Sequence, residues 1–437
     1  MSDQHRAPSC QCKCAHQTQT DAEKQFNTSS LYHVPDGYTP WSIRNDYPST
    51  TPAHDPTPLF GPDPITQSEK YLEAVKTYCL EGMVENDFVP QKNKKRQWYH
   101  APWMHYSTDG REPLHGLTSE RYLPPREFSA TQERYTQAWA VGFFNATGAS
   151  VLGEMWKDPN DPQWTKNIDF PWNTVIYKLL FSNATNNEIP FLAGAPHWQA
   201  MIAVQPEDPT KEPDPAVRIT NAPNDVRLLQ MDIAVKDKRS TATGWVWGTF
   251  IYDGNCGKTG YDGLAPVGLS WGNDPKLDQK AYESGERAKD VWIDGPVNDL
   301  RASLNGVRPF WGWNGRLAGP VDNFISACQS CHSTAQWNPY TQSQGTSIVP
   351  PAPDVTADVK FIPVNDNITM TWFTNVPGGT AIAPRAFSAD NSLQLMIGYE
   401  NYVAWREKNN WEQGGKKGPP PVDRRPTHRR QGPKLEF

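Results

Sequence analysis

The feature that most constrains this chain is a Cys-x-x-Cys-His sequence at residues 328–332. In a helical turn, residues three and four positions apart lie on one face. The two thiols and the imidazole therefore converge on the same side of a short helix. The turn at 319–323 and the apolar approach at 324–327 are compatible with a helix that begins just before the motif.

This pattern is the signature of covalent haem c attachment. Cys328 and Cys331 can form thioethers with the two vinyl groups of one porphyrin, and His332 can bind the iron as the proximal ligand. A thiol–disulfide pair is an alternative, but no thioredoxin-like βαβ context surrounds the motif. Half of a zinc site is another, but no second ligand pair lies nearby. Chance occurrence is the third. The motif and its setting favour one covalently attached haem c.

Composition narrows the class of protein. The chain has 437 residues, a formal net charge of -6 and a pI of about 6, so no basic field favours nucleic acid. It contains 41 Pro and 18 Trp, which indicates a loop-rich protein held by aromatic clusters. No apolar run is long enough to span a bilayer, so no transmembrane segment is expected.

Haem c attachment also predicts a compartment. Haem c is attached outside the reducing cytoplasm, so a periplasmic or otherwise exported protein is expected. The segment Met1–Asp21 is polar and shows no apolar core of a secretory signal peptide. The export route is therefore left open.

The sequence divides into four regions. Residues 1–65 are predicted to be a disordered or extended arm, and residues 411–437 a basic disordered tail. Residues 66–318 are predicted to hold a helix and a mainly β domain, and residues 319–410 the haem region. The arm carries four residues that could bind a soft metal, but we interpret them as part of a flexible Cys-rich tail rather than as a metal site: Cys10, Cys12, Cys14 and His16.

The middle region is dominated by strand patterns. A first helix is predicted at Gln67–Val84, with Cys79 on its buried face. The predicted strands are Trp139–Asn145, Val175–Phe181, Arg227–Val235 and Gly244–Tyr252, the last two as antiparallel neighbours. Trp-rich loops are expected at Ser270–Asn273, Val291–Ile293 and Phe310–Gly315. The predicted class is α+β: a mostly antiparallel β domain with Trp-rich loops, plus a small helical cytochrome c-like haem region.

Residues 98–118 combine several aromatic side chains with His100, His105 and His115. Each histidine alone is more simply explained by hydrogen bonding in an aromatic loop. As a whole, the segment is predicted to form a wall of the haem pocket, because a redox centre needs apolar cover. The three histidines remain reserve candidates for a sixth iron ligand.

The order of motif helix, long loop and final helix, Asn391–Asn409, resembles the single-haem c-type cytochrome domain over about a fifth of the chain. Three short segments resemble segments of large, poorly characterised bacterial proteins with one c-type haem: Gly110–Thr118, Gly319–Asn323 and Trp372–Pro377. The cytochrome resemblance implies a distal methionine from the loop before the last helix, which is Met370 here. Met396 follows too, but it lies on the packing face of the final helix.

The resemblance implies a protein that transfers single electrons to unidentified redox partner proteins. A haem enzyme, peroxidase-like or oxidase-like, with an open distal site is the second hypothesis. A haem-containing ligand-binding or sensor module is the third. Neither a phosphate-binding glycine loop nor clustered carboxylates can be found to support another chemistry.

Overall fold

The computed structural model describes residues 34–52, 61–104, 111–202, 222–304, 311–339, 370–412 and 416–417. Predictions about the Cys-rich arm and one histidine lie outside these residues: Cys10, Cys12, Cys14, His16 and His105.

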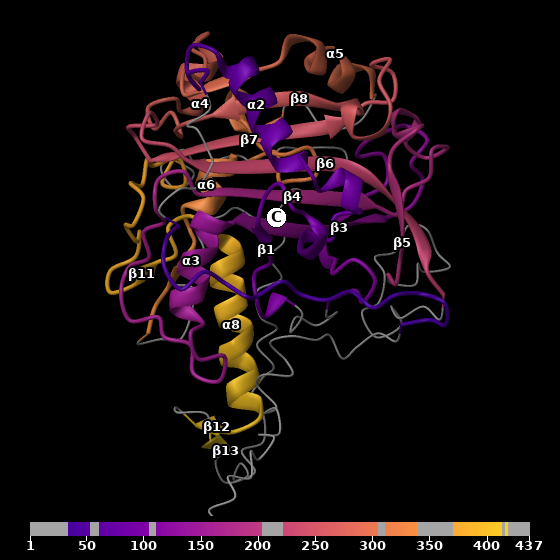
Figure 1. Cartoon of the computed structure of the whole chain (residues 1–437). Coiled ribbons are helices and arrows are strands. Elements are labelled where there is room, and N and C mark those ends of the chain that lie inside the picture. Colours follow the sequence, from indigo (N-terminus) through magenta and orange to yellow (C-terminus); the bar gives the residue numbers. More distant parts are fainter. Residues whose placement is uncertain are drawn as a thin grey trace, which may run out of the picture.

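An antiparallel sheet of nine strands forms the centre of the described chain (Figure 1). Its strands are β1 (Trp98–Tyr99), β2 (Thr118–Leu123), β3 (Thr136–Asn145), β4 (Val175–Ser182), β5 (His197–Ala200), β6 (Asn224–Lys236), β7 (Trp245–Tyr252), β8 (Leu264–Ser270) and β9 (Val291–Ile293). The main order is β1-β3-β4-β6-β7-β8-β9, with β2 beside β3 and β5 beside β6. Two small pairs, β10 (Gln336–Trp337) with β11 (Phe387–Ser388) and β12 (Trp411–Glu412) with β13 (Lys416–Lys417), lie apart from it.

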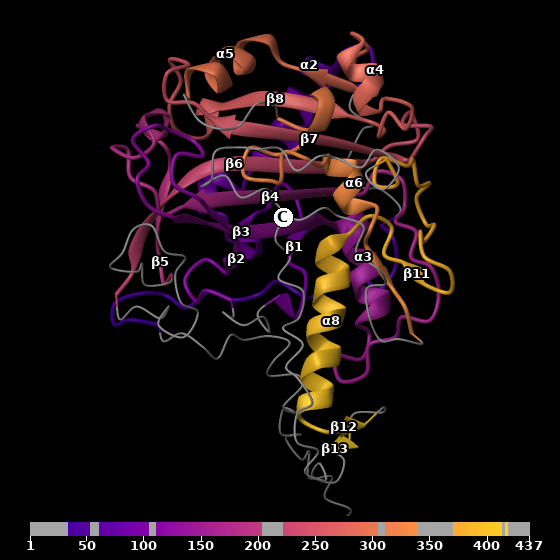
Figure 2. The ribbon, with the colours of Figure 1, turned by 180° about the vertical axis from the view of Figure 1, so that it is seen from behind.

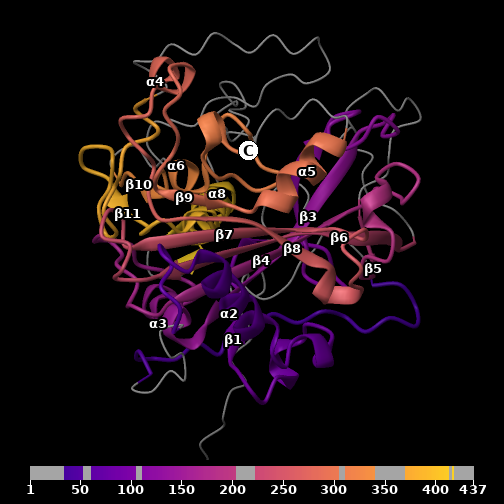
Figure 3. The same cartoon turned by 90° about the horizontal axis from the view of Figure 1, so that it is seen from above.

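Helices cover both faces of the sheet. They are α2 (Ser68–Leu80), α3 (Ala146–Met155), α4 (Gln279–Glu283), α5 (Gly295–Ser303), α6 (Cys328–His332) and α8 (Leu393–Lys408). Single 3₁₀ turns are η1 (Val84–Asn86), η2 (Pro90–Lys92), η4 (Pro190–Leu192), η6 (Gly260–Gly263) and η7 (Trp313–Gly315). Seen from above, α2 lies on one side of the sheet and α6 on the other (Figure 3). The view from behind shows α8 running away from α6 beside α3 (Figure 2).

The strand predictions for the middle region are confirmed. The four predicted strands correspond to β3, β4, β6 and β7, and β6 pairs antiparallel with β7. The first and last predicted helices are α2 and α8, and Cys79 is fully buried on α2. The α+β class, a mostly antiparallel sheet with a few helices, is therefore the observed fold.

One local prediction was wrong. Val291–Ile293 is not a loop but β9, because Trp292 pairs with Leu269 of β8 in the ladder. Asn145, the last residue of β3, is also the N-cap of α3, since its side chain accepts a hydrogen bond from the Gly148 amide at 3.0 Å.

The described part of the arm, residues 34–52, contains no helix or strand and packs on the segment that follows α2. The Arg44 amide donates to His100 Nδ1 at 2.9 Å, and the Tyr47 hydroxyl donates to the His100 carbonyl at 2.7 Å. The predicted tail, 411–437, is described only at β12 and β13. None of the described helices has the length and apolar character needed to cross a membrane.

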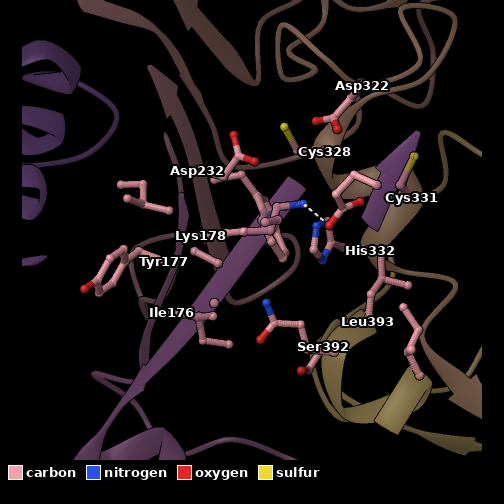
Figure 4. A pocket seen from close by; sticks show the side chains of 18 of the residues that line it. Ile176, Tyr177, Lys178, Asp232, Asp322, Cys328, Cys331, His332, Ser392 and Leu393 are labelled. Carbon is pink, nitrogen blue, oxygen red and sulfur yellow. Dashed lines mark hydrogen bonds and ion pairs between the residues drawn. The ribbon is translucent and has the colours of Figure 1, made fainter. Parts of the chain in front are cut away.

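Because side chains alternate along each strand, one face of the sheet packs on α2 and the other faces α6. Tyr177 of β4 belongs to the apolar cluster shared with α2, and a side chain on Gly248 of β7 would lie 2.4 Å from Leu72 of that helix. The neighbouring residue Lys178 points to the opposite face, where α6 lies (Figure 4). Trp247 lies on that face too, because its ring contacts His332 of α6. This second face carries the candidate site.

Candidate functional site

Helix α6 has five residues, so it is stabilised by hydrogen bonds to neighbouring segments rather than by the intrinsic helix propensity of its sequence. The Cys328 amide donates to the Leu317 carbonyl at 2.7 Å, and Ser330 Oγ accepts from the Ala327 amide at 2.8 Å. The Gln329 side chain accepts a hydrogen bond from Trp247 Nε1 at 2.7 Å. The motif is therefore fixed against β7 of the sheet.

A cavity with a volume of about 130 Å³ lies between α6, the sheet and the start of α8. Cys328, Cys331 and His332 all line it (Figure 4). The sheet side of the cavity includes three small residues on β3 and β6: Ala140, Gly142 and Ala234. The Gln394 side chain packs against one of them, Gly142.

His332 is held in one orientation. Its Nδ1 lies 2.9 Å from the Asn391 carbonyl oxygen, so Nδ1 carries the proton and donates. Asp390 and Asn391 have φ of 48° and 65°, a left-handed conformation that Asp and Asn tolerate and that turns this carbonyl toward the ring. Trp247 covers the imidazole, with ring centroids 4.0 Å apart. The bond leaves Nε2 with a free lone pair.

Burial lowers the pKa of His332 to about 4, with a smaller contribution from Lys178, although the Asn391 carbonyl acts in the opposite direction. The ring is therefore neutral at physiological pH. A neutral imidazole whose other nitrogen donates to a backbone carbonyl is the usual state of a metal-binding histidine.

The two cysteines of the motif are free thiols, not a disulfide. Burial raises the pKa of Cys328 well above its ordinary value and that of Cys331 to about 11. Thiol–disulfide enzymes need the opposite shift, because the thiolate is the reactive form. The environment of these two thiols therefore disfavours the disulfide-exchange interpretation.

A charged cluster lines the same cavity. Lys178 Nζ lies 3.5 Å from Glu120 Oε1, and Asp232 is the direct cross-strand neighbour of Lys178 (Figure 4). Asp232 accepts hydrogen bonds from Thr249 and Gln230 at 2.7 Å. Burial, with the nearby carboxylate of Asp322, raises the pKa of Asp232 to about 7.

Burial and the neighbouring charges also shift the pKa values of Lys178 and Glu120. Burial opposes the charge of Lys178, but the surrounding carboxylates outweigh it and raise its pKa. Burial raises the pKa of Glu120, while Lys178 lowers it. The cluster thus holds one cation and a carboxyl group that titrates near neutrality.

The other predicted ligands are not brought to the cavity. Met370 is partly buried in a separate cluster with Trp313 and Phe373, and Met396 is fully buried in the core around α8. His100 is buried against Arg44, and the ring of His115 stacks on Trp198 at 4.4 Å. None of these four residues is among those that line the cavity.

Part of the 98–118 segment does line the cavity, as a wall: Ala101, Met104, Arg111, Gly116 and Thr118. Met104, Lys178 and Asp232 were not singled out from the sequence. Lys178 had a readable signal, since it is the one charge in β4, and Asp232 interrupts the apolar second half of β6.

Within the described ranges, no three His, Cys, Asp or Glu side chains are grouped so as to hold a metal ion by themselves. A porphyrin supplies the equatorial ligands of its own iron, so one histidine is compatible with haem. Comparison of the chain with protein-family models, curated proteins and solved structures found no match.

Proposed function

We propose that this chain binds one haem c covalently through Cys328 and Cys331, with His332 as the proximal iron ligand, and transfers single electrons. The observation that carries the proposal is the orientation of His332. Its Nδ1 is engaged by the Asn391 carbonyl, its Nε2 has no hydrogen-bond partner among the described residues, and the ring lines the same cavity as the two free thiols.

The residues present fit this group. The helical turn places the two thiols and the imidazole on the wall of one cavity, and the sheet side of that cavity includes the small residues Ala140, Gly142 and Ala234. Haem would supply the one-electron chemistry. The chain would bury the ring, keep His332 neutral and fixed, and exclude water through Trp247.

The experiment is to produce the full chain with a haem c attachment system and measure the pyridine haemochrome spectrum and intact mass after acid–acetone extraction. We expect one haem per chain, retained after extraction. A Cys328→Ser/Cys331→Ser variant is expected to retain none. The matched control, Cys256→Ser, changes an exposed cysteine and is expected to keep the full haem content. Colourless wild-type protein with the mass of the bare chain would end the proposal.

The distal ligand is a separate prediction. The cytochrome resemblance points to Met370, whereas Met104 lines the cavity. A weak far-red absorption band of the ferric protein reports an iron–methionine bond. If Met370 binds, Met370→Leu abolishes the band and Met104→Leu keeps it; the reverse result transfers the role to Met104. A wild-type protein without the band excludes both methionines.

That last result would favour the second candidate function, a peroxidase-like or oxidase-like enzyme with an open distal site. The specific observation in its favour is the Lys178–Glu120–Asp232 cluster, because groups that titrate near neutrality suit proton transfer. A high-spin ferric spectrum that shifts on addition of cyanide or peroxide distinguishes it from the electron carrier.

The proposal includes a compartment and partners. Haem c attachment places the protein in the periplasm or another exported location, and its partners are redox proteins that accept or donate one electron. In this proposal residues 319–410 form the cytochrome c-like haem region. Of this region, α6 contributes the motif and the turn before α8 contributes Asn391, and the sheet supplies the opposite wall.

A further inference from the structure

Arg111 is a buried cation without a counter-charge. Its side chain is 4% exposed and lines the cavity. Among the described residues its polar contact is one hydrogen bond, from Nη2 to the Ala101 carbonyl at 3.2 Å, while its Nε is buried without a partner. The ring of Trp41 lies 4.8 Å from the guanidinium carbon.

The neighbouring acid does not neutralise this charge. Glu112 turns its carboxylate to the amides of Leu114, His115 and Met201, at 2.7–3.0 Å. No described carboxylate forms an ion pair with Arg111. Burial lowers the pKa of Arg111 to about 10, so the guanidinium stays charged at neutral pH.

An uncompensated buried charge costs several kcal/mol unless a partner is supplied. A guanidinium pairs best with a planar oxyanion, which can accept two parallel hydrogen bonds. We infer that Arg111 is an oxyanion-binding subsite of the cavity, and that the ligand of the cavity presents a carboxylate or a similar oxyanion to it.

Two kinds of ligand could supply the oxyanion that pairs with Arg111. A porphyrin carries propionate carboxylates, and in that case the inference deepens the proposed function and rests on it. A small free oxyanion, such as nitrite or formate, would instead bind beside the haem. The experiment separates the two sources and does not require haem for its first part.

In the first part, the haem-free full chain is unfolded in urea with and without nitrite or formate, against chloride at equal ionic strength. Arg111→Met is expected to be at least as stable as wild type, because the substitution removes an unpaired buried charge. The oxyanions are expected to stabilise the wild type and not the variant.

Arg316 offers a matched control. It is equally buried, but its guanidinium donates to the backbone carbonyls of Asn273, Asp274 and Leu277 at 2.8 Å. Arg316→Met is therefore expected to destabilise the haem-free chain. If Arg111→Met destabilises it equally and oxyanions have no effect on the wild type, Arg111 is structural and the inference is overturned.

In the second part, the same comparison is made on the haem-loaded chain. With propionate as the source, the loaded wild type no longer responds to free oxyanions, and Arg111→Met shifts the ratio of oxidised to reduced haem several-fold toward oxidised at fixed potential. With a free oxyanion as the source, the loaded wild type still responds. Arg111→Lys keeps the charge and is expected to retain part of either effect. If the chain does not incorporate haem, the proposed function is wrong, but the urea unfolding of the haem-free chain still tests the role of Arg111.

Discussion

Replacing Asp390 by alanine is expected to destabilise the folded protein by about 3–5 kcal/mol, the usual cost of removing one partner of a buried ion pair. Asp390 is 0% exposed, and its carboxylate lies 2.5 Å from Nζ of Lys236, which is 2% exposed. It also accepts hydrogen bonds from the Phe170 amide at 2.6 Å and from Trp245 Nε1 at 2.9 Å. The substitution would remove the buried partner of Lys236 and leave it only the exposed carboxylate of Asp169.

The measurement is urea unfolding of the full chain, followed by tryptophan fluorescence. Lys236 has a second carboxylate partner, Asp169, at 2.9 Å, but this side chain is 71% exposed. Asp169→Ala is the matched control and is expected to cost at most about 1 kcal/mol. Equal losses for the two variants would contradict the account. The double variant Lys236→Met/Asp390→Leu is expected to recover much of the stability, because neither member of the buried ion pair remains and Asp169 is exposed to solvent.

This ion pair also concerns the candidate site. Asp390 precedes Asn391, whose carbonyl fixes His332, and the ion pair anchors this turn to β6. The turn must therefore be held for the imidazole to keep its orientation. We expect Asp390→Ala to reduce haem attachment as well as stability, whereas Asp169→Ala reduces neither substantially.

How much of this could be predicted from the sequence depends on the range of the interactions involved. The strands β3, β4, β6 and β7 are long, rich in β-branched and aromatic residues, and readable from local pattern. The motif of α6 is likewise local. The strand β9 has three residues and exists because Val291–Ile293 pairs with β8, which no local pattern reveals.

The surroundings of the motif depend on long-range contacts. Asn391 meets His332 across 59 residues of sequence, and Trp247 meets Gln329 across 82. Neither contact follows from residue spacing. By contrast, Lys178 and Asp232 break apolar strands, and antiparallel pairing makes them neighbours. This cluster could therefore be predicted from the sequence, because a charged residue in a buried part of a strand requires a nearby partner.

The cluster of Lys178 and Asp232 leads to the prediction with the second largest expected effect on stability. Asp232→Asn is expected to stabilise the protein at neutral and alkaline pH, but not near pH 4. Asp232 has a pKa of about 7 in the folded chain, compared with about 4 for an ordinary aspartate. The folded state therefore binds a proton more tightly than the unfolded state does. The contribution of Asp232 to stability is fully present below about pH 4 and is lost as the pH rises to about 7.

Each pKa unit corresponds to about 1.4 kcal/mol, so the loss is at most roughly 4 kcal/mol. The groups that face Asp232 are Lys178 on β4, Thr249 on β7, Gln230 on its own strand, Asp322 before α6 and Cys328 in α6, and Glu120 on β2 acts through Lys178. Lys178 pairs with the carboxylate form and limits the effect.

Unfolding free energies of wild type and Asp232→Asn, measured from pH 4 to pH 8, test this prediction. Their difference is expected to be small at pH 4, to grow in favour of the variant up to about pH 7, and then to level off. Asp225→Asn, on the exposed start of the same strand, should show no such rise. A constant difference across the range would mean that Lys178 fully compensates the charge of Asp232. The cluster would then be a structural ion network rather than a proton-binding group beside the candidate haem site.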